Sequence, residues 1–459
     1  GVLLCCGLLA ACSGSTESGD GGTDAAVDAG PVADPWSVYP AQELDPPRAW
    51  HLLRGIIHIH SPYSHDACDD EPFTEGVRNE VCFEDLRQGL CDTRQDFAFV
   101  TDHAALFAEY EYPDVILYKE GDTLIEREGA PVANRLRCGD GHEVLISAGT
   151  ETGMMPIGLE RHVAETVEAR KAIYNDISAD AIEQMHAAGG LVFLQHTEGW
   201  TVEQVLELPI DGIELYNTHQ NLMENMGAVF EMMVNLESYP ERLPVIELAL
   251  LTVFQENQRD MERWSFACLQ RPMPGIMATD AHRNAFPNPS PDGERLDSFR
   301  RLTHWFSNYL LVDKVAPDDR DLKEVIAQGR MYGAFDLLGY QEGFDFHAEV
   351  DGQIHEMGAR IPGQQAELVV VMPRVHELDP AAEPPVLQAR ILKAVAEGQW
   401  EEVASGEGDL QVSVGPGVYR AEVRMVPKHW RAYLGEMADE LLAQDFPWIY
   451  ANPIYVGLY

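Results

Sequence analysis

Short apolar runs alternate with polar segments of helical length over residues 55–282. This alternation is typical of buried parallel strands connected by helices, so it predicts an α/β sheet or barrel. From about residue 343 the pattern changes to closely spaced strands, which predicts a small antiparallel β-sandwich. The seven apolar runs of the first part are residues 55–60, 97–103, 143–151, 161–165, 191–196, 212–217 and 274–282.

The same pattern divides the chain into an N-terminal extension and two folded domains. We expect the barrel to occupy residues 50–338 and the β-sandwich residues 339–459. Residues 1–12 are apolar and small and end in Leu9-Ala10-Ala11-Cys12, which resembles a bacterial lipoprotein signal with a lipid anchor on Cys12; an ordinary secretory signal is the alternative. Residues 13–49 then predict a flexible tether. The expected location is therefore the bacterial cell envelope, on the periplasmic side or at the outer-membrane surface.

Cysteine usage agrees with export. Four cysteines, Cys68, Cys82, Cys91 and Cys138, lie in or beside predicted loops. In an oxidising compartment they predict two disulfides, and three pairings are open. Cys268 lies in an apolar helical stretch and is expected to be a buried thiol.

The charge balance excludes one class of partner. The chain carries 76 acidic and 32 basic residues, a formal net charge of -44. Such a surface repels phosphate backbones, so no nucleic acid partner is expected.

The first apolar run ends in His58-Ile59-His60. On a regular strand, residues i and i+2 point to the same face, so the two imidazoles could bind one metal ion. A single motif of this kind is more often a strand end with two satisfied histidines. Six of the seven runs, however, end in His, Asp or Glu. Working residues of α/β barrels lie at the carboxyl ends of the strands, so this recurrence favours a site with several metal ions.

Four motifs, in this order, resemble the polymerase-and-histidinol-phosphatase (PHP) family. They are His58-Ile59-His60, Thr101-Asp102-His103, Gly149-Thr150-Glu151 and Asp280-Ala281-His282. The resemblance covers about residues 50–335 and implies a distorted (β/α)7 barrel with two or three metal ions. A narrower similarity, to the carbaryl-hydrolase-like branch of that family, depends on Ser64-His65-Asp66 and on residues 448–456.

The motifs and the resemblance together give a set of candidate site residues. Imidazoles and carboxylates in one site suit Zn, Mn or Fe(II). Glu151 is the expected bridge between two ions, because a carboxylate offers two oxygens. His65 and Asp66 are alternatives for one position, and Asp66 is preferred. The predicted metal ligands are His58, His60, Asp66, His103, Glu151, His162, His196, Asp280 and His282.

Other residues are expected to act beside the metal ligands. Asp102 is expected to orient a histidine or to accept a proton. Arg283 follows the last ligand and could bind an anionic substrate group, with a surface ion pair as the equal alternative. Asn217 and His219 follow the sixth run and are expected to line the pocket.

These features lead to three hypotheses about function. The first is an exported hydrolase that uses a metal-activated water on phosphomonoesters or phosphodiesters. The second is hydrolysis of a small carbamate or carboxylic ester by the same site. The third, from another class, is a metal-binding or ligand-binding surface lipoprotein without turnover.

Overall fold

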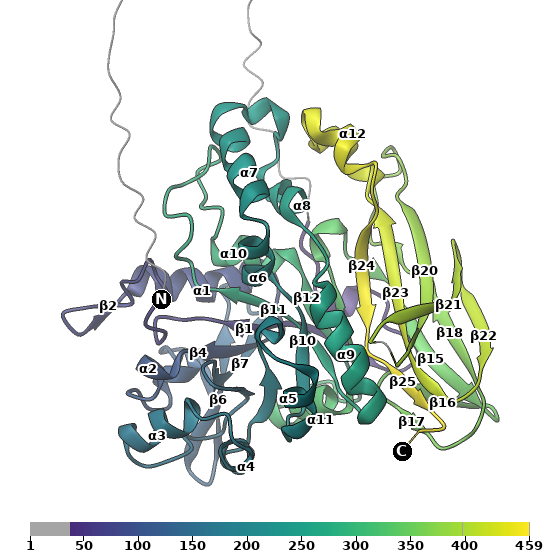
Figure 1. The fold of residues 1–459 in the computed structure, drawn as a ribbon. Coiled ribbons are helices and arrows are strands. Elements are labelled where there is room, and N and C mark those ends of the chain that lie inside the picture. Colours follow the sequence, from purple (N-terminus) through teal and green to yellow (C-terminus); the bar gives the residue numbers. More distant parts are fainter. Residues whose placement is uncertain (1–36, 397, 459) are drawn as a thin grey trace, which may run out of the picture. The chain divides into compact units, whose positions relative to one another are not determined.

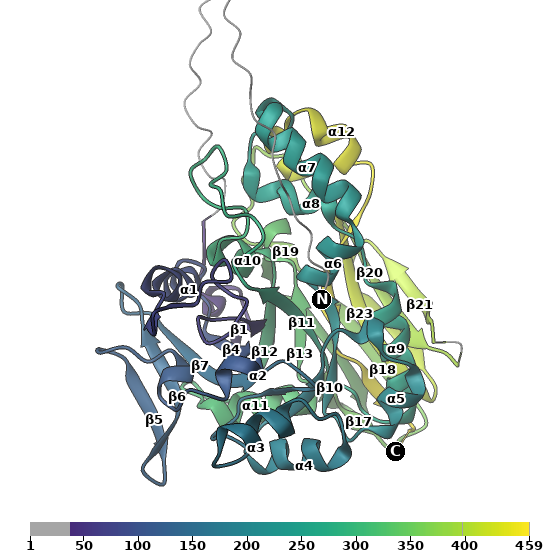
Figure 2. The ribbon, with the colours of Figure 1, turned by 60° about the vertical axis from the view of Figure 1, so that its left-hand side comes forward.

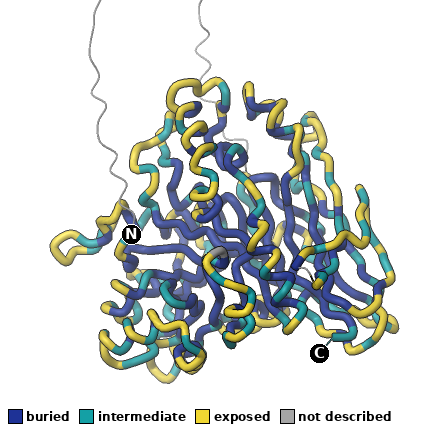
Figure 3. Tube along the Cα trace, viewed as in Figure 1, coloured by how far each residue is buried: buried dark blue, intermediate teal, exposed yellow. Residues whose placement is uncertain are grey.

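Six parallel strands form the centre of the fold, hydrogen-bonded in the order β7, β4, β1, β11, β10 and β9 (Figure 1). Each coincides with one of the apolar runs, so the predicted α/β pattern is confirmed. The strands are buried over almost their whole length, as a doubly covered parallel sheet requires (Figure 3). Their bounds are β1 (His51–Ile59), β4 (Phe97–Asp102), β7 (Glu143–Thr150), β9 (Leu191–Leu194), β10 (Gly212–Asn217) and β11 (Gly275–Ala281).

The computed structural model describes residues 37–396 and 398–458. The predicted signal, Cys12 and most of the tether therefore lie outside the described residues. The last part of the tether, residues 37–49, contacts the folded unit. Leu44 is buried and its carbonyl accepts a hydrogen bond from the Gly343 amide at 3.2 Å, while Arg48 is ion-paired with Asp345. Among the described helices, none combines the length and the apolar character that a membrane span needs.

Antiparallel strands flank the parallel set. β8 (Met155–Ile157) pairs with β9, and an isolated bridge joins Leu159, just after β8, to Ala148 of β7. On another side, β12 (Ser307–Val312) pairs with β1, and β13 (Met331–Ala334) pairs with β12. A hairpin of β5 (Thr123–Arg127) and β6 (Ala130–Arg137) extends β7.

Two of the expected elements differ in the structure. Residues 161–165 form no strand, because Thr166 accepts a hydrogen bond from the Ala169 amide and begins helix α3 (Val167–Tyr174) directly after them. The Met-rich segment of residues 221–236, whose apolar spacing predicts one amphipathic helix, is divided into α6 (Thr218–Glu224) and α7 (Met226–Ser238). Asn225 separates the two helices, and its side chain donates to the Val253 carbonyl at 2.9 Å. This tertiary contact interrupts a segment whose local periodicity predicts one helix.

The remaining helices cover the strands on several sides. Figure 2 shows α6, α7 and α8 gathered at one end and α3 and α4 at the other. We call α6, α7 and α8 the helical cover; α6 packs against β11, which carries two of the predicted ligands at its end. The bounds not yet given are α1 (Glu80–Asp92), α4 (Ala179–Ala187), α5 (Val202–Glu207), α8 (Ala249–Val253), α9 (Gln258–Gln270), α10 (Phe299–Trp305) and α11 (Asp319–Gln328).

The C-terminal part is built from antiparallel sheets, as its pattern predicts. One sheet has the order β16, β15, β18 and β22, and the strands β20, β21, β23, β24 and β25 join the large sheet. β24 pairs with β13, so the backbone hydrogen bonding continues across residue 338, the predicted boundary between the two domains. Trp448 of β24 is fully buried, and its indole N–H donates to the Gly339 carbonyl at 2.8 Å. The bounds are β15 (Asp345–Val350), β16 (Gln353–Glu356), β18 (Ala366–Val371), β20 (Val386–Ala394), β21 (Trp400–Gly406), β22 (Leu410–Val414), β23 (Gly417–Val426), β24 (Phe446–Ala451) and β25 (Ile454–Val456).

A buried ion-pair network holds α10 in place and generates a first prediction. Glu247 accepts hydrogen bonds from Arg300 at 2.8 and 3.1 Å and contacts His304 Nδ1 at 2.8 Å. Burial would raise the pKa of Glu247, but His304 and Arg300 outweigh it and lower the pKa to about 2. The pKa in the unfolded chain is about 4.3, so the network stabilises the fold fully above that pH and progressively less as the pH falls toward 2.

We expect Glu247→Gln to lower the free energy of unfolding at pH 7 by about 3 kcal/mol, because the buried carboxylate loses its charge and Arg300 loses one of its two carboxylate partners. The difference from the wild type should shrink as the pH falls from 5 toward 2. Urea unfolding at a series of pH values measures both effects. Glu324→Gln, on the exposed side of α11, is the control and should change stability by less than about 0.5 kcal/mol. A stability difference between the wild type and Glu247→Gln that does not depend on pH would contradict the assignment of this pH dependence to Glu247.

Candidate metal centre

An irregularity in β1 places the first pair of histidines. The register of β1 shifts between Ile57 and Ile59 against both neighbouring strands, and His58 has a φ of 65°. His58 and His60 approach each other, with ring centroids 5.2 Å apart, through this bulge and not through the regular alternation expected from the sequence. Asp280 and His196 also have positive φ, 51° and 48°. Such conformations are costly for residues other than glycine, and they gather where a site fixes its side chains.

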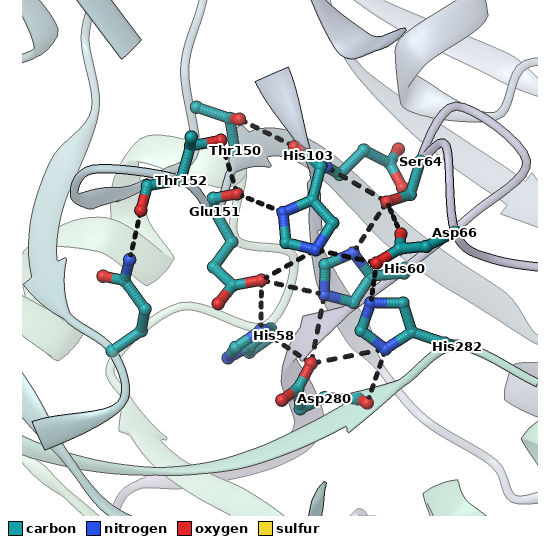
Figure 4. Close-up of polar contacts among 12 residues, drawn as sticks. His58, His60, Ser64, Asp66, His103, Thr150, Glu151, Thr152, Asp280 and His282 are labelled. Carbon is teal, nitrogen blue, oxygen red and sulfur yellow. Dashed lines mark hydrogen bonds and ion pairs between the residues drawn. The ribbon is translucent and has the colours of Figure 1, made fainter. Parts of the chain in front are cut away.

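The structure brings eight of the nine predicted ligands together in two groups, and Figure 4 labels all of them except His196. Within each group, one donor atom of every residue lies within 4.8 Å of the donor atoms of the others. The first group is His60, Asp66, His103 and His282, and the second is His58, Glu151, His196 and Asp280.

Two carboxylates lie between the groups. Glu151 Oε2 is 3.3 Å from His60 Nε2 in the first group and 3.4 Å from His58 Nε2 in its own, while Oε1 is 2.8 Å from His196 Nε2. Asp280 Oδ1 is 3.2 Å from the Nε2 atoms of both His58 and His60. Each carboxylate therefore offers oxygens to both groups, which is the arrangement that two neighbouring cations require.

Five of the donor atoms have no hydrogen-bond partner among the described residues. The Nε2 atoms of His58, His60 and His282, with Glu151 Oε2 and Asp280 Oδ1, are buried and form no hydrogen bond within the described part of the chain. Buried polar atoms nearly always have such a partner. Because these five atoms converge, and because imidazole nitrogens and carboxylate oxygens suit Zn, Mn or Fe(II), the residues present fit divalent metal ions.

Electrostatics at the centre keep the acids ionised. Burial would raise the pKa of Glu151 and of Asp280, but the surrounding imidazoles, His58 foremost, hold both well below their usual range. Burial likewise would lower the pKa of His58, yet Asp280, Glu214 and Glu151 raise it well above its usual value. Two ionised carboxylates in a buried site create a strong local preference for positive charge.

In the first group, the second ring nitrogen of each histidine also contacts the protein. His103 Nδ1 contacts the Glu151 carbonyl at 2.6 Å and His282 Nδ1 contacts the Asp280 carbonyl at 3.0 Å. His60 Nδ1 is 3.2 Å from Ser64 Oγ. These contacts orient the rings and direct each Nε2 toward the centre.

Glu214 is a site residue that the sequence reasoning missed. It lies in β10, fully buried, with Oε1 2.5 Å from His58 Nδ1, and its Oε2 accepts a hydrogen bond from the His196 amide at 3.2 Å. One carboxylate thus positions two residues of the second group. The signal in the sequence was an acid inside an otherwise apolar strand, because such an acid is rarely buried without a partner.

The loop after β1 supplies one ligand of the first group. Asp66 Oδ2 is 3.2 Å from His103 Nε2 and 3.5 Å from His282 Nε2, and Ser64 Oγ donates to Asp66 Oδ1 at 2.8 Å. The His65 side chain is 56% exposed and lies outside both groups. The structure thus places Asp66, and not His65, at the centre.

Two of the predicted residues, His162 and Asp102, have other contacts. His162, expected as a ligand, lies outside the groups; its nitrogens contact the Tyr110 carbonyl at 2.7 Å and the Tyr174 hydroxyl at 3.1 Å, so both already have protein partners. Asp102 accepts hydrogen bonds from the Ser61 amide and hydroxyl, both at 2.6 Å, and thus fixes the loop after β1 and not a histidine ring. Burial raises the pKa of Asp102 to about 6.

Arg283 is ion-paired beside the centre. Its Nε lies 2.7 Å from Asp85 and a terminal nitrogen lies 3.7 Å from Asp69. Of the two readings open from the sequence, the geometry matches the ion pair. The guanidinium is held by carboxylates, which leaves it poorly placed for an anionic substrate group.

Two disulfides form, as the sequence predicts, and their pairing is Cys68–Cys82 and Cys91–Cys138. The first joins α1 to the loop that carries Asp66. The Cys68 amide also donates to the His282 carbonyl at 3.0 Å. This disulfide therefore fixes two ligand-bearing segments against each other. Cys268 is buried, as predicted, and lies outside both disulfides.

We expect Glu214→Gln to lower the affinity for divalent metal by about 10- to 100-fold, because His58 loses the charged partner that orients it. Competition titration against a chelating dye measures this affinity for Zn²⁺ and Mn²⁺. Glu207→Gln, at the exposed end of α5, is the matched control and should bind metal as the wild type does. Equal affinities in all three proteins would show that Glu214 does not position the site.

The two disulfides should differ in their effect on metal binding. Replacing Cys68 and Cys82 by serine should cost about 3 kcal/mol of stability and lower metal affinity at least about tenfold, because the Asp66 loop loses its anchor. Replacing Cys91 and Cys138 opens a longer loop and should cost about 4 kcal/mol, with metal affinity unchanged. Denaturation and chelator competition, measured on both double variants, test this difference. Equal metal affinities would contradict it.

Comparisons with known proteins add little to the geometry. No family model matches the chain, and no curated protein matches it. Among solved structures, the chain is similar to PsfC from Pseudomonas syringae PB-5123, with 12% sequence identity and a TM-score of 0.34 over 62% of this chain and 91% of that one. A likeness at this TM-score supports no inference about fold or function.

Proposed function

We propose that this protein is a metal-dependent hydrolase that cleaves an ester with a metal-activated water. The observation that carries the proposal is the pair of donor groups with Glu151 and Asp280 between them. A site that only stored one ion would need no second group. A third set of donors, His219 with Asp280 and His282, fits the expectation of two or three ions.

We further propose that the strands form the (β/α)7 barrel of the PHP family. The order from β7 through β4, β1, β11 and β10 to β9 supports this, as does the bridge between Ala148 and Leu159 on the remaining side. The four motifs that carry the resemblance stand at the ends of β1, β4, β7 and β11, where barrel enzymes place their working residues.

The chemistry follows from the donor set. When bound, two divalent ions lower the pKa of a water to near neutrality and stabilise the negative charge of the transition state. The protein's part is to keep Glu151 and Asp280 ionised, to hold the imidazole Nε2 atoms inward, and to fix the loop of Asp66 through Ser64 and the Cys68–Cys82 disulfide. Glu214 supports the second group from behind.

Two substrate classes follow from this chemistry. The resemblance favours phosphomonoesters or phosphodiesters. The pairing of Arg283 with Asp85 and Asp69 favours the second candidate, an uncharged carbamate or carboxylic ester, because the guanidinium is already occupied. A binding lipoprotein without turnover is the remaining alternative. Anchoring in the cell envelope through Cys12 belongs to the same proposal, although that residue lies outside the described part of the chain.

Metal analysis and an ester panel test the proposal. We expect the purified protein to contain about two or three equivalents of Zn, Mn or Fe and to hydrolyse p-nitrophenyl phosphate or p-nitrophenyl acetate in a chelator-sensitive reaction. His58→Ala and Asp280→Ala should lower kcat/KM by more than about 100-fold, a larger loss than a supporting residue gives.

His376→Ala serves as the matched control, since His376 is also paired with a carboxylate, Glu342 at 3.0 Å, but belongs to neither donor group. It should keep both the metal and the activity. Absence of bound metal, or activity that survives both ligand substitutions, would refute the hydrolase proposal. Bound metal without turnover of any ester would instead favour the binding protein.

A further inference from the structure

A pocket opens directly beside the proposed metal centre. It lies between the end of β11, the helical cover and α10, and its enclosed volume is about 40 Å³. This volume is far below that of a drug-sized site and leaves room only for a short hydrocarbon group. Its lining includes Asp280, His282 and His219, which also form the third set of donors. A substrate group attached to the reacting centre could therefore extend into the pocket without crossing any part of the chain.

The walls of the pocket are mainly apolar. They come from several elements that the fold brings together: α6, α7, α8, α10 and the segment before α10. His219 lines the pocket, as predicted, whereas the apolar walls could not be predicted because none of their residues adjoins a predicted ligand in the sequence. The apolar wall residues are Leu222, Met232, Leu250, Phe286, Leu296 and Leu302.

Three polar residues of the lining, Asp297, Asn284 and Arg283, have partners within the protein. Asp297 accepts hydrogen bonds from the amides of Ala285 and Phe286 at 2.8 and 2.9 Å. Asn284 donates to the Asp66 carbonyl at 2.7 Å, and Arg283 is paired with Asp85. A charged or strongly hydrated group in this pocket would lose its water without gaining these partners, which is costly.

We propose that the pocket binds an apolar hydrocarbon group of the substrate, so that the protein selects esters carrying a compact aliphatic chain over small or fully polar esters. This inference depends on the proposed hydrolase and specifies its substrate class. The metal centre holds the ester group, and the chain lies against Leu222 and Met232 of the helical cover. Met232 is flexible and adapts to chains of different shape.

A series of straight-chain acids and esters tests the proposal. The acids are acetate, propanoate and butanoate, whose carboxylate mimics the product and whose short chain matches the volume of the pocket. Calorimetry on the full chain loaded with Zn²⁺ or Mn²⁺ should show affinity rising roughly fourfold per buried methylene group. The p-nitrophenyl esters of the same acids should show the same trend in kcat/KM.

Substitutions at Leu222 place the effect in the pocket. Leu222→Trp should fill the space and lower butanoate affinity at least tenfold while changing acetate affinity less than twofold. Leu222→Ala, which is easier to accommodate, should move the best chain length upward. Leu206→Trp and Leu206→Ala, at a leucine of α5 that is also half-buried but lies outside the pocket, are the matched controls and should leave the series unchanged.

The outcomes separate the two proposals. Affinity and kcat/KM that do not depend on chain length, with chelator-sensitive turnover intact, would overturn the apolar pocket and leave the hydrolase standing. The same result would follow if Leu206 and Leu222 variants behaved alike. Absence of chelator-sensitive turnover for every ester would overturn the hydrolase, and the substrate class with it.

Discussion

The burial of two ionised carboxylates among imidazoles is the constraint on which the rest of the site depends. Glu151 and Asp280 come from the ends of β7 and β11, and each is within reach of both donor groups. Taking such charges out of water costs several kcal/mol each unless opposite charge is close. The parallel strands satisfy this condition by ending side by side, so that His58 and His60 arrive from the end of β1 and His196 from the loop after β9.

Support for this arrangement comes from residues of quite different kinds. Glu214 holds a ring and a backbone amide from inside the sheet, while Asp102 fixes the loop after β1 through Ser61. Cys68 ties that loop to α1 by a disulfide and to the end of β11 by its amide. The C-terminal strands lie at a distance from the donors and extend the large sheet, since β24 pairs with β13. Several different elements of the fold thus stabilise the site and position its side chains.

Much of this could be predicted from the chain alone. The ends of the apolar runs carry the predicted ligands in a recurring pattern, which is a strong local signal, and eight of the nine predicted ligands lie together in the two donor groups. The misses have physical causes. His162 looked like a ligand by position, but tertiary contacts to Tyr110 and Tyr174 use both nitrogens. The bulge at His58, the role of Glu214 and the pairing of the cysteines depend on which strands become neighbours, and local sequence does not encode that directly.

The left-handed backbone at His58, His196 and Asp280 has a consequence for the choice of ion. Each such residue costs of order 1–3 kcal/mol, and the surrounding strands must sustain that cost before any ion arrives. Because the backbone fixes the donor positions in advance, the site cannot expand or contract freely around an ion. For the proposed metal site, affinity for cations of different radius would then depend on the fixed spacing of the donors more than on their intrinsic strength, so that the fold itself would select the ion by its size.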